Sequence, residues 1–548
     1  MGDVKRWFVK GVWGSVILSV VILAFVGGVR IRAWVWNNSE DIWWYSNIAN
    51  AYAWGARVLD GPDKANAGNG ATTWGNLWSG YKVLYDEVDH DSGFKKVSLD
   101  YVPLRLLVNA VWVRHIRLAE PGAAKWKPEY SYFVLNLNTA AGIAAALAAF
   151  LLVRYWVRLD RAADGLHQRA AVPMLYGLIA GLLVWFNAAV ILEGYAWPQW
   201  DVWPVPFYLF GLYFASINGW ARAGAALALG ALFKGQILFA APFVLLWPLF
   251  QLRWVAVGRL LIGFAALATL GTWQWLVQGA LLITTMCVVP VLLSAVAIWF
   301  WRKQPRRVTV RKSATVLAAA FAVTVIAIGS ISDRASMAWF RVGYVTGTEK
   351  YPVMARNCAC NLPAILDQSF HWRLHDKVFT NAHGEGGVEM KSLLMWCFSG
   401  ALVACSAGGA WHAQRRSRFF LIAAGLPWIL MFAVVPQMDG RYLIYGAATS
   451  AIFIGCGMGP TLLHLLLTGM SYAMMFKFLI HGHAAHWPAS EQALSGIEPG
   501  MGWAMVLAAM ILLYLAIAPR RRRVKIRATT GEIIPVPPLL AELQPTAG

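Results

Sequence analysis

The stretch VWGSVILSVVILAFVGGV, residues 12–29, decides the fold, because it is an uncharged apolar run close to the length that crosses a bilayer. Lys5, Arg6 and Lys10 precede it, as basic residues precede a secretory signal, but no small-residue cleavage site follows it. We therefore expect residues 12–29 to remain in the protein as a first membrane span.

Similar runs recur along the whole chain of 548 residues, which is 59% hydrophobic, only 14% charged and contains 30 Trp. A soluble domain needs a far more charged surface, so this composition excludes that class. The sequence predicts an all-α polytopic membrane protein with about 14 transmembrane helices. The expected spans are 12–29, 131–153, 171–192, 203–219, 221–236, 237–252, 254–276, 279–301, 313–332, 392–412, 419–436, 443–459, 461–480 and 501–519.

The distribution of charge predicts the orientation of the spans. With the N-terminus in the cytoplasm, every short basic loop falls on the cytoplasmic side, as the positive-inside rule requires. The C-terminus then also lies in the cytoplasm. The net charge of +20 reflects this orientation and an attraction to anionic lipid. Nucleic acid is not an expected partner, because the basic residues form no patch within one folded domain.

Two long segments are expected on the outer side of the membrane. The first, residues 30–130, contains a helical pattern in which Trp44, Ile48, Ala51 and Tyr52 recur at helical spacing, so this outer loop is predicted to be helical. A second amphipathic pattern covers residues 99–118, whose arginines, Arg105, Arg114 and Arg117, are expected to reach lipid headgroups. The expected division is 1–332 for a membrane core that includes loop 30–130, 333–391 for an outer insert, 392–519 for C-terminal membrane helices and 520–548 for a basic, Pro-rich cytoplasmic tail.

Acidic residues gather at the outer rim of the predicted spans. A carboxylate at the boundary between water and lipid can act as a general base, and aromatic neighbours raise its basicity by reducing its hydration. For Glu40 and Asp41 the competing interpretation is a helix start, because acids favour the first turn of a helix. The rim acids are Glu40, Asp41, Asp100, Glu193, Asp201 and Asp439.

Lys234 and Arg441 are the cations expected at the same rim. Arg can bind a phosphate with two parallel hydrogen bonds and Lys as a point charge. The competing interpretation is that both simply extend toward the membrane surface, as long cationic side chains commonly do.

Metal and thiol chemistry is weakly marked. The stretch HGHAAHWP, residues 481–488, matches no specific zinc spacing, so we predict no metal-ligating residue set, although outer acids could hold a divalent metal ion. Cys358 and Cys360 form a CxC pair in the outer insert, and either a disulfide or two free thiols is compatible with that spacing.

Several stretches together resemble the GT-C superfamily of polyprenyl-phosphate-sugar-dependent glycosyltransferases. SEDIWWYSNIANAYAWGA, residues 39–56, resembles the acidic motif of the superfamily's first outer loop, and LDYVPL, residues 99–104, is similar to a DYPPL element. FNAAVILEGYAWPQWDVWPVPFYLFGLYFAS followed by ALALGALFKGQILFAAPFVLLWP resembles the mannosyltransferase pattern NP…GQ.D, then K-x-Q. VVPQMDGRYLIYGAA resembles the P-x-M-HERY motif, with Asp439 and Gly440 in place of His and Glu. The resemblance covers residues 12–250 and 419–445.

The resemblance implies a GT-C-like helix bundle and a role for each matching residue. Asp41 is implied as the catalytic base, with Glu40 as the second choice. A further set would bind the acceptor or the sugar: Asp100, Tyr101, Gln199 and Asp201. A last set would hold the lipid phosphate: Lys234, Gln236, Arg441 and Tyr442.

The implied reaction is an inverting transfer of a sugar from a polyprenyl-phosphate donor to an acceptor hydroxyl. The acceptor would be a glycan, a lipid or a protein, and no cofactor is implied apart from the divalent ion considered above. The implied location is the inner, cytoplasmic membrane, with the active site on the periplasmic side and membrane lipids as further partners.

Two other functional classes stay open. A lipid or sugar transporter or flippase would place ionisable residues or broken helices near the midplane of the membrane. A polymerase or ligase of the O-antigen type also acts on lipid-linked sugars at the outer face, but its main outer loop usually comes late in the chain. Substitution of Asp41 and transport assays in proteoliposomes would separate these classes.

Overall fold

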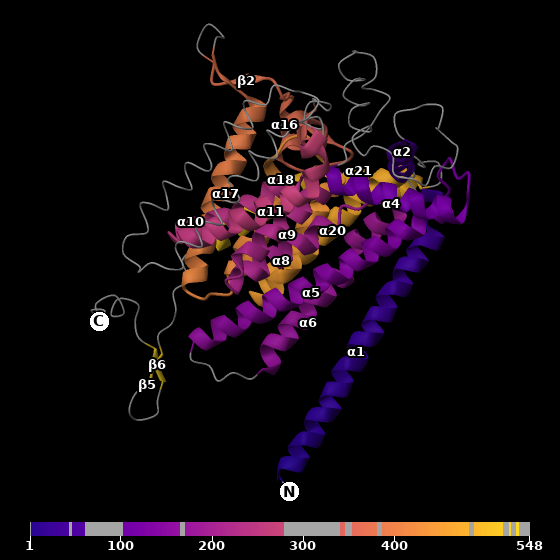
Figure 1. The fold of residues 1–548 in the computed structure, drawn as a ribbon. Helices are drawn as coiled ribbons and strands as arrows, with labels where there is room; N and C mark the ends of the chain where they lie inside the picture. The colour runs from indigo at the N-terminus through magenta and orange to yellow at the C-terminus, as the bar shows by residue number, and fades with distance from the viewer. Residues whose placement is uncertain are drawn as a thin grey trace.

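The computed structural model of the chain describes residues 2–42, 46–60, 102–164, 170–278, 340–345, 353–380, 386–481, 487–518, 525–527 and 533–535. Within these residues the fold is a bundle of helices, with a long first helix, α1, along one side (Figure 1). The helices are α1 (Gly2–Asn38), α2 (Ser46–Asp60), α4 (Pro103–Ala119), α5 (Tyr132–Ala163), α6 (Ala171–Trp185), α7 (Ala188–Ile191), α8 (Pro204–Ser216), α9 (Trp220–Phe233), α10 (Ile237–Phe250), α11 (Trp254–Gln278), α16 (Leu362–Phe370), α17 (Met390–Gln414), α18 (Phe420–Val434), α19 (Leu443–Thr449), α20 (Met458–His481) and α21 (Pro488–Ile517).

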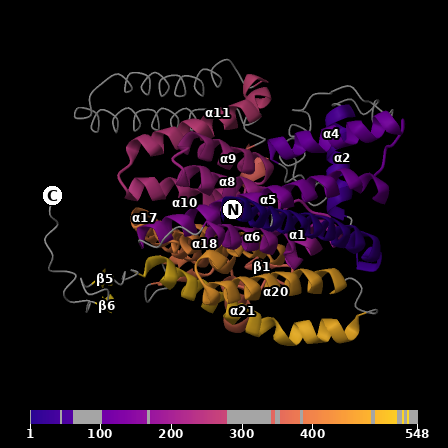
Figure 2. The ribbon, with the colours of Figure 1, turned by 90° about the horizontal axis from the view of Figure 1, so that it is seen from below.

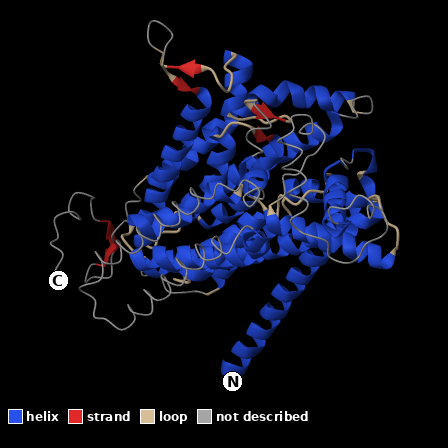
Figure 3. Cartoon of the chain, turned by 45° about the horizontal axis from the view of Figure 1, so that its top comes forward, coloured by secondary structure: helices blue, strands red, loops and turns tan. Residues whose placement is uncertain are grey.

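Strands are few and short among the described residues. β1 (Ala355–Arg356) pairs in parallel with β4 (Met438–Asp439), and the other pairs are antiparallel. The remaining strands are β2 (Lys377–Val378), β3 (Val388–Glu389), β5 (Lys525–Arg527) and β6 (Ile533–Pro535). Figure 3 shows how small these strands are beside the helices that make up most of the described chain.

Seven of the described helical segments are long and apolar enough to cross a membrane. They are Leu18–Asn38, Pro128–Ala163, Ala171–Ala196, Trp254–Thr272, Met390–Gln414, Met458–His481 and Pro488–Ile517. Three more apolar helices, α9, α10 and α18, are shorter. The protein is therefore an all-α membrane protein, as predicted, but the count of about 14 spans is not confirmed. The predicted spans 279–301 and 313–332 lie outside the described residues.

The segment expected to span at 443–459 takes a different form. α19 ends at Thr449, and a 3-10 helix, Ser450–Gly455, continues the chain. Every residue of α19 is buried, so this segment lies inside the bundle and has no lipid-facing side. An apolar run alone does not distinguish a lipid-facing span from an interior helix, which explains the difference.

Glycines allow several helices to approach closely. A Cβ atom on Gly224 of α9 would lie 1.9 Å from the carbonyl oxygen of Leu260 in α11, and one on Gly263 would lie 1.9 Å from that of Ala221. Small residues of this kind are typical of helix contacts in membranes, because they let two backbones touch. Helices α9 and α11 are therefore in direct contact through their backbones.

The helices predicted within residues 30–130 are confirmed where the structure describes them, whereas Trp44 lies outside the described residues. Ile48, Ala51 and Tyr52 of α2 are buried as the pattern indicated, and Tyr52 packs edge-on against Trp112 of α4. α2 and α4 lie beside each other (Figures 1 and 2), and α16 and β2, from residues 333–391, are found at the same end of the bundle, away from the start of α1 (Figure 1).

The expectation that the arginines of α4 reach lipid headgroups is wrong for two of them. Arg105 and Arg117 are 3% and 2% exposed. The guanidinium of Arg117 binds Asp60 at the end of α2, with 2.6 Å between Nη1 and Oδ1. Arg105 lies over the ring of Trp200, 4.2 Å from its centroid. A buried partner for each charge outweighs the tendency of arginine to reach water, and the amphipathic pattern does not reveal such a partner.

Candidate functional site

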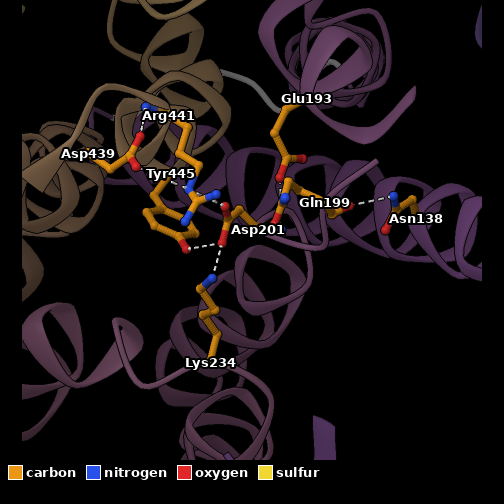
Figure 4. Close-up of polar contacts among 8 residues, drawn as sticks. All are labelled: Asn138, Glu193, Gln199, Asp201, Lys234, Asp439, Arg441 and Tyr445. Carbon is orange, nitrogen blue, oxygen red and sulfur yellow. Dashed lines mark hydrogen bonds and ion pairs between the residues drawn. The ribbon is translucent and has the colours of Figure 1, made fainter. Parts of the chain in front are cut away.

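Asp201 is the centre of a buried charged cluster between the membrane helices (Figure 4). Its side chain has no exposed surface, and one carboxylate oxygen, Oδ1, lies 2.5 Å from Nζ of Lys234. The hydroxyl of Tyr445 donates a hydrogen bond of 2.9 Å to the same oxygen. Nε of Arg441 lies 3.4 Å from the other oxygen, Oδ2. One carboxylate thus joins three residues that are distant in sequence.

The segment that carries Asp201 is fixed by polar contacts from α5. The amide Nδ2 of Asn138 donates to the carbonyl oxygens of Gly194, at 3.0 Å, and Gln199, at 2.6 Å. Its Oδ1 accepts a hydrogen bond of 2.7 Å from the indole of Trp203. Asn138 is 3% exposed, so its amide gives this irregular backbone the partners that water would otherwise supply.

Glu193 lies beside Asp201 in a single π-helical turn, Leu192–Ala196, that follows α7. Its Oε1 accepts a hydrogen bond of 3.1 Å from the backbone N–H of Asp201, and its side chain is fully buried. π-Helical turns inside helices are frequent at functional sites. Two carboxyl groups therefore lie close together inside the bundle.

Lys234 and Arg441 reach Asp201 from the ends of two different helical elements. Lys234 is the residue at which α9 ends, and its extended backbone (φ −157°, ψ 118°) turns the side chain away from the helix. Arg441 lies in a 3-10 turn, Gly440–Tyr442, directly after β4. Oδ1 of Asp439 accepts a hydrogen bond of 3.2 Å from the backbone N–H of Arg441 and so begins that turn.

The charges in the cluster reinforce each other. Burial alone would raise the pKa of Asp201, but the charges of Lys234 and Arg441 outweigh burial and lower this pKa to about 2. Burial would lower the pKa of Arg441, whereas Asp439, Tyr442 and Asp201 act in the opposite direction and hold it well above its ordinary value. Asp201 is therefore an anion and Arg441 a cation at neutral pH.

Aromatic rings surround the cations. Nζ of Lys234 lies 5.7 Å from the ring centroid of Tyr442, and the guanidinium carbon of Arg441 lies 5.3 Å from the rings of both Tyr442 and Trp197. Rings at these distances stabilise a cation through the negative charge of their faces. The two cations are thus held by both a carboxylate and aromatic rings.

Four of the predicted site residues come together in this cluster: Asp201, Lys234, Arg441 and Tyr442. Gln199 lies next to it, with a side chain that is 2% exposed. Gln236 stands at the N-cap of α10 and is partly exposed.

The two residues predicted as catalytic base, Glu40 and Asp41, are exposed in a 3-10 turn that follows α1. No hydrogen bond or ion pair joins Asp41 to another residue that the structure describes. The adjacent Ile42 packs against the apolar cluster that contains Trp197. Asp100 and Tyr101 lie outside the described residues.

Asn138 and Tyr445 are site residues that the sequence analysis did not identify. Asn138 is a polar residue within the apolar run 131–153, which is the signal that could have revealed it. Tyr445 follows Tyr442 by one helical turn and offered no distinct signal.

The side chains of the cluster do not resemble a set of metal ligands. No group of three or more His, Cys, Asp and Glu side chains is placed to hold a metal ion in the part of the chain that the structure describes. Asp201 instead directs both carboxylate oxygens toward protein cations. The cluster therefore combines two cations with two carboxylates, Asp201 and Asp439.

Comparison with known proteins gives no family: no protein-family model matches the chain, and no curated protein matches it significantly.

Proposed function

We propose that the protein is a membrane glycosyltransferase that moves a sugar from a polyprenyl-phosphate donor to an acceptor hydroxyl, with inversion at the anomeric carbon. The observation that supports this proposal most is the convergence of Lys234 and Arg441 on one buried carboxylate. The motifs that resemble GT-C enzymes name these two residues as the ligands of the lipid phosphate. Chance would not readily bring them together from positions so far apart in the sequence.

The exposures of the charged side chains in the cluster support phosphate binding. The side chain of Asp201 is fully buried, whereas those of Lys234 and Arg441 are 6% and 12% exposed. The two cations are therefore slightly nearer to solvent than the carboxylate that they share. Nε of Arg441 lies near both Asp201 and Asp439, and a guanidinium is the side-chain group best suited to bind a phosphate with paired hydrogen bonds.

Asp201 is a poor base, because a carboxyl group with a pKa near 2 holds a proton weakly. We assign it to the cations, whose positions it fixes. The base would then be Asp41, which is exposed and lies one residue from Ile42, a side chain that packs on the cluster containing Trp197. Arg441 lies over the ring of Trp197, a member of that same apolar cluster, and this is the observation that supports placing Asp41 near the cations.

The proposed reaction balances without a cofactor. The acceptor oxygen forms a bond to the anomeric carbon while Asp41 takes the hydroxyl proton. The bond between that carbon and the phosphate oxygen breaks, and polyprenyl phosphate leaves with the electron pair. Lys234 and Arg441 stabilise the charge that develops on the leaving phosphate. We place this reaction at the outer face of an inner membrane, with both termini in the cytoplasm.

One observation favours a second function, transport of a lipid or a sugar. Glu193 is fully buried and belongs to the apolar segment Ala171–Ala196, and it lies beside the equally buried Asp201. Buried acids at membrane depth often mark ion or substrate pathways. A transporter is expected to place ionisable residues near the midplane of the membrane, and the burial of this pair agrees with that expectation.

The test is a transfer assay on the purified protein in lipid nanodiscs, with a panel of polyprenyl-phosphate sugars and a membrane glycolipid extract as acceptor. We expect release of polyprenyl phosphate by the wild-type protein, loss of release in Asp41→Asn, and no change in Asp367→Asn, an exposed acid of α16. Transfer at the wild-type rate by Asp41→Asn would remove Asp41 as the base. Uptake or flipping in proteoliposomes without any transfer would support the second function instead.

A further inference from the structure

Residues 353–361, which belong to the predicted outer insert, are attached directly to the segment that carries Arg441. β1 pairs with β4 in the register Ala355 with Met438 and Arg356 with Asp439. The backbone N–H of Gln437 donates to the carbonyl oxygen of Met354 at 2.7 Å, just before this pairing begins. Part of the insert, to which the sequence assigned no role, is thus part of the structure around the charged cluster.

The same residues are fixed at their other end. Nδ2 of Asn361 donates to the carbonyl oxygen of Phe432 in α18 at 2.9 Å, and the backbone N–H of Cys360 points at the sulfur of Met474 in α20, 3.2 Å away. Asn361 and Cys360 are 0% and 2% exposed. Contacts with two membrane helices therefore determine where this segment lies.

Between these attachments the chain makes a tight turn at Asn357 and Cys358, both with positive φ (46° and 58°). Residues other than glycine adopt this backbone at a cost, so surrounding contacts must hold it. The turn directs Nδ2 of Asn357 to Oδ2 of Asp439, with a hydrogen bond of 2.6 Å. The strained turn thus places the side-chain amide of Asn357 against the carboxylate of Asp439.

Gly440 makes this contact sterically possible. A Cβ atom at Gly440 would lie 2.5 Å from the carbonyl oxygen of Asn357 and 3.3 Å from the backbone nitrogen of Ala359. A larger residue at this position would force the two backbones apart. The glycine that replaces the Glu of the HERY motif therefore gives the turn at Asn357 room to lie on Asp439.

The carboxylate of Asp439 connects the insert to Arg441. Its Oδ1 accepts from the backbone N–H of Arg441 at 3.2 Å, and its Oδ2 lies 3.8 Å from Nε of the same residue. Asp439 is 1% exposed, so it depends on protein groups for its hydrogen bonds. A neutral amide is suited to this carboxylate, because it satisfies an oxygen without adding a charge that would compete with Arg441.

We infer that Asn357 is a positioning residue: it holds Asp439, which in turn sets the guanidinium of Arg441 in the charged cluster, so that residues 353–361 complete the site. Its effect on sugar transfer rests on the proposed function, whereas its effect on the placement of Arg441 does not. The inference gives the outer insert a role that can be measured without a substrate.

The experiment uses Asn357→Asp in the full-length protein, because this change keeps the shape of the side chain and places a second carboxylate against Asp439. At pH 7.5 the two anions repel each other, and we expect hydrogen exchange of backbone amides in residues 437–443 to become about tenfold faster. Asn218→Asp is the matched control, since Asn218 is exposed and accepts a hydrogen bond through Oδ1, which aspartate retains. We expect this control to exchange like the wild type.

The pH dependence separates positioning from simple packing. When the pH falls, a pair of neighbouring carboxyl groups binds one proton and can form a hydrogen bond again, so exchange in Asn357→Asp should return toward the wild-type rate near pH 5. Other charged groups near the turn are Arg441 beside Asp439, Arg356, which is the strand partner of Asp439, Lys477 of α20, and Glu491 and Glu498 of α21. Their charges stay the same in wild type and variant, so the difference between the two proteins reports the new pair.

Exchange of residues 437–443 at the wild-type rate in Asn357→Asp at pH 7.5 would overturn the inference. The inference would also fail if the ratio of the exchange rate in Asn357→Asp to that in the wild type were above one and the same at pH 7.5 and pH 5. A packing defect would give such a constant ratio. If the wild type transfers sugar, kcat/KM in Asn357→Asp should fall at least about tenfold at pH 7.5. If the wild type has no transfer activity, the proposed function fails, and the exchange measurements still decide the role of Asn357.

Discussion

At the scale of single residues, Asp201 shows how a carboxylate is kept charged inside a membrane protein. Lys234, Arg441 and Tyr445 all bind its two oxygens, so the cost of burying one negative charge is offset by two cations and a hydroxyl. The partners depend equally on Asp201. Removing the carboxylate would leave two buried cations without this anion, which costs more free energy than keeping the three charges together.

We predict that Asp201→Asn lowers the free energy of unfolding by about 3–5 kcal/mol, the usual effect of breaking a buried ion pair. Thermal unfolding in detergent, followed by the rise in Trp fluorescence wavelength, measures the loss. Asp367→Asn is the control and should unfold like the wild type, because Asp367 is exposed on α16. An unchanged unfolding temperature for Asp201→Asn would show that Lys234 and Arg441 do not depend on this carboxylate.

The stabilisation by Asp201 should vary with pH in one direction. Its pKa of about 2 in the folded state lies below the value of about 3.9 in an unfolded chain, so its contribution is fully present above pH 4 and is lost as the pH falls toward 2. The difference in unfolding temperature between the wild type and Asp201→Asn should therefore be constant from pH 8 to pH 5 and shrink below pH 4. A difference that grows on acidification would contradict the assignment of Asp201 as a stabilised anion.

The CxC pair offers a further prediction about residues. Cys358 and Cys360 are both free thiols, which answers the question that their spacing left open. Burial raises the pKa of Cys358 to about 11 and that of Cys360 to about 12, so at pH 7.5 little thiolate is present. Maleimide should modify both at least about 100-fold more slowly in the folded protein than in dodecyl sulfate. Equal rates in the two conditions would place these thiols at the surface.

At the scale of elements, α1 is attached to the bundle through one face. Gly28 faces Trp185 of α6, whose indole donates to the carbonyl oxygen of Ala24, and Arg32 lies 3.6 Å above the ring of the same tryptophan. Nη2 of Arg32 also donates to the backbone oxygen of Trp185 at 2.8 Å, so the arginine supplies a hydrogen-bond partner to the last residue of α6. The position of Glu40 and Asp41 beyond α1 depends on this contact.

Two neighbouring glycines test this attachment. A Cβ atom on Gly28 would lie 2.0 Å from Nε1 of Trp185, whereas one on Gly27 would meet open space. Gly28→Ala should therefore destabilise the protein by about 1–3 kcal/mol through overpacking. Gly27→Ala should be neutral or stabilising, because alanine favours helices over glycine.

Limited proteolysis of residues 39–60 and the unfolding temperatures of Gly28→Ala and Gly27→Ala measure whether α1 is still attached to α6. The attachment would be refuted if the two variants behaved alike.

Elements differ in how well the sequence predicted them. α2 was predicted because Ile48, Ala51 and Tyr52 recur at helical spacing, which is a local property of the chain. The interior position of α19 and the burial of Arg105 and Arg117 depend on partners far away in sequence, which no local pattern contains. The same reason explains the site: motifs indicated Lys234 and Arg441, but the roles of Asn138, Tyr445 and Asn357 became visible only through their contacts.

At the scale of the whole molecule, the described helices form a membrane bundle in which the charged cluster is enclosed by elements from both halves of the chain. Asp201 and Lys234 come from the first half, and Arg441 and Tyr445 from the second. Helices α2 and α4, from residues 30–130, and α16, from residues 333–391, lie at the same end of the bundle (Figure 1). A site assembled in this way requires both halves to fold together.

The orientation of the bundle follows from the charges of its short loops, and we predict that both termini lie in the cytoplasm. A green fluorescent protein fused after Gly548 should fluoresce, and alkaline phosphatase fused at the same place should be inactive. An impermeant maleimide added outside intact cells should modify Asp367→Cys, because this position on α16 belongs to the outer insert. Active phosphatase at the C-terminus would reverse the orientation and move the site to the cytoplasmic face.

The central claim is that Lys234 and Arg441 hold the phosphate of a lipid donor, and a structure of the protein in nanodiscs with a bound polyprenyl phosphate tests it most directly. We predict phosphate oxygens about 2.7–2.9 Å from the guanidinium of Arg441 and the ammonium of Lys234, with the polyprenyl chain extending toward lipid. Phosphate bound elsewhere in the protein, with the contacts of both cations to Asp201 unchanged, would contradict the account.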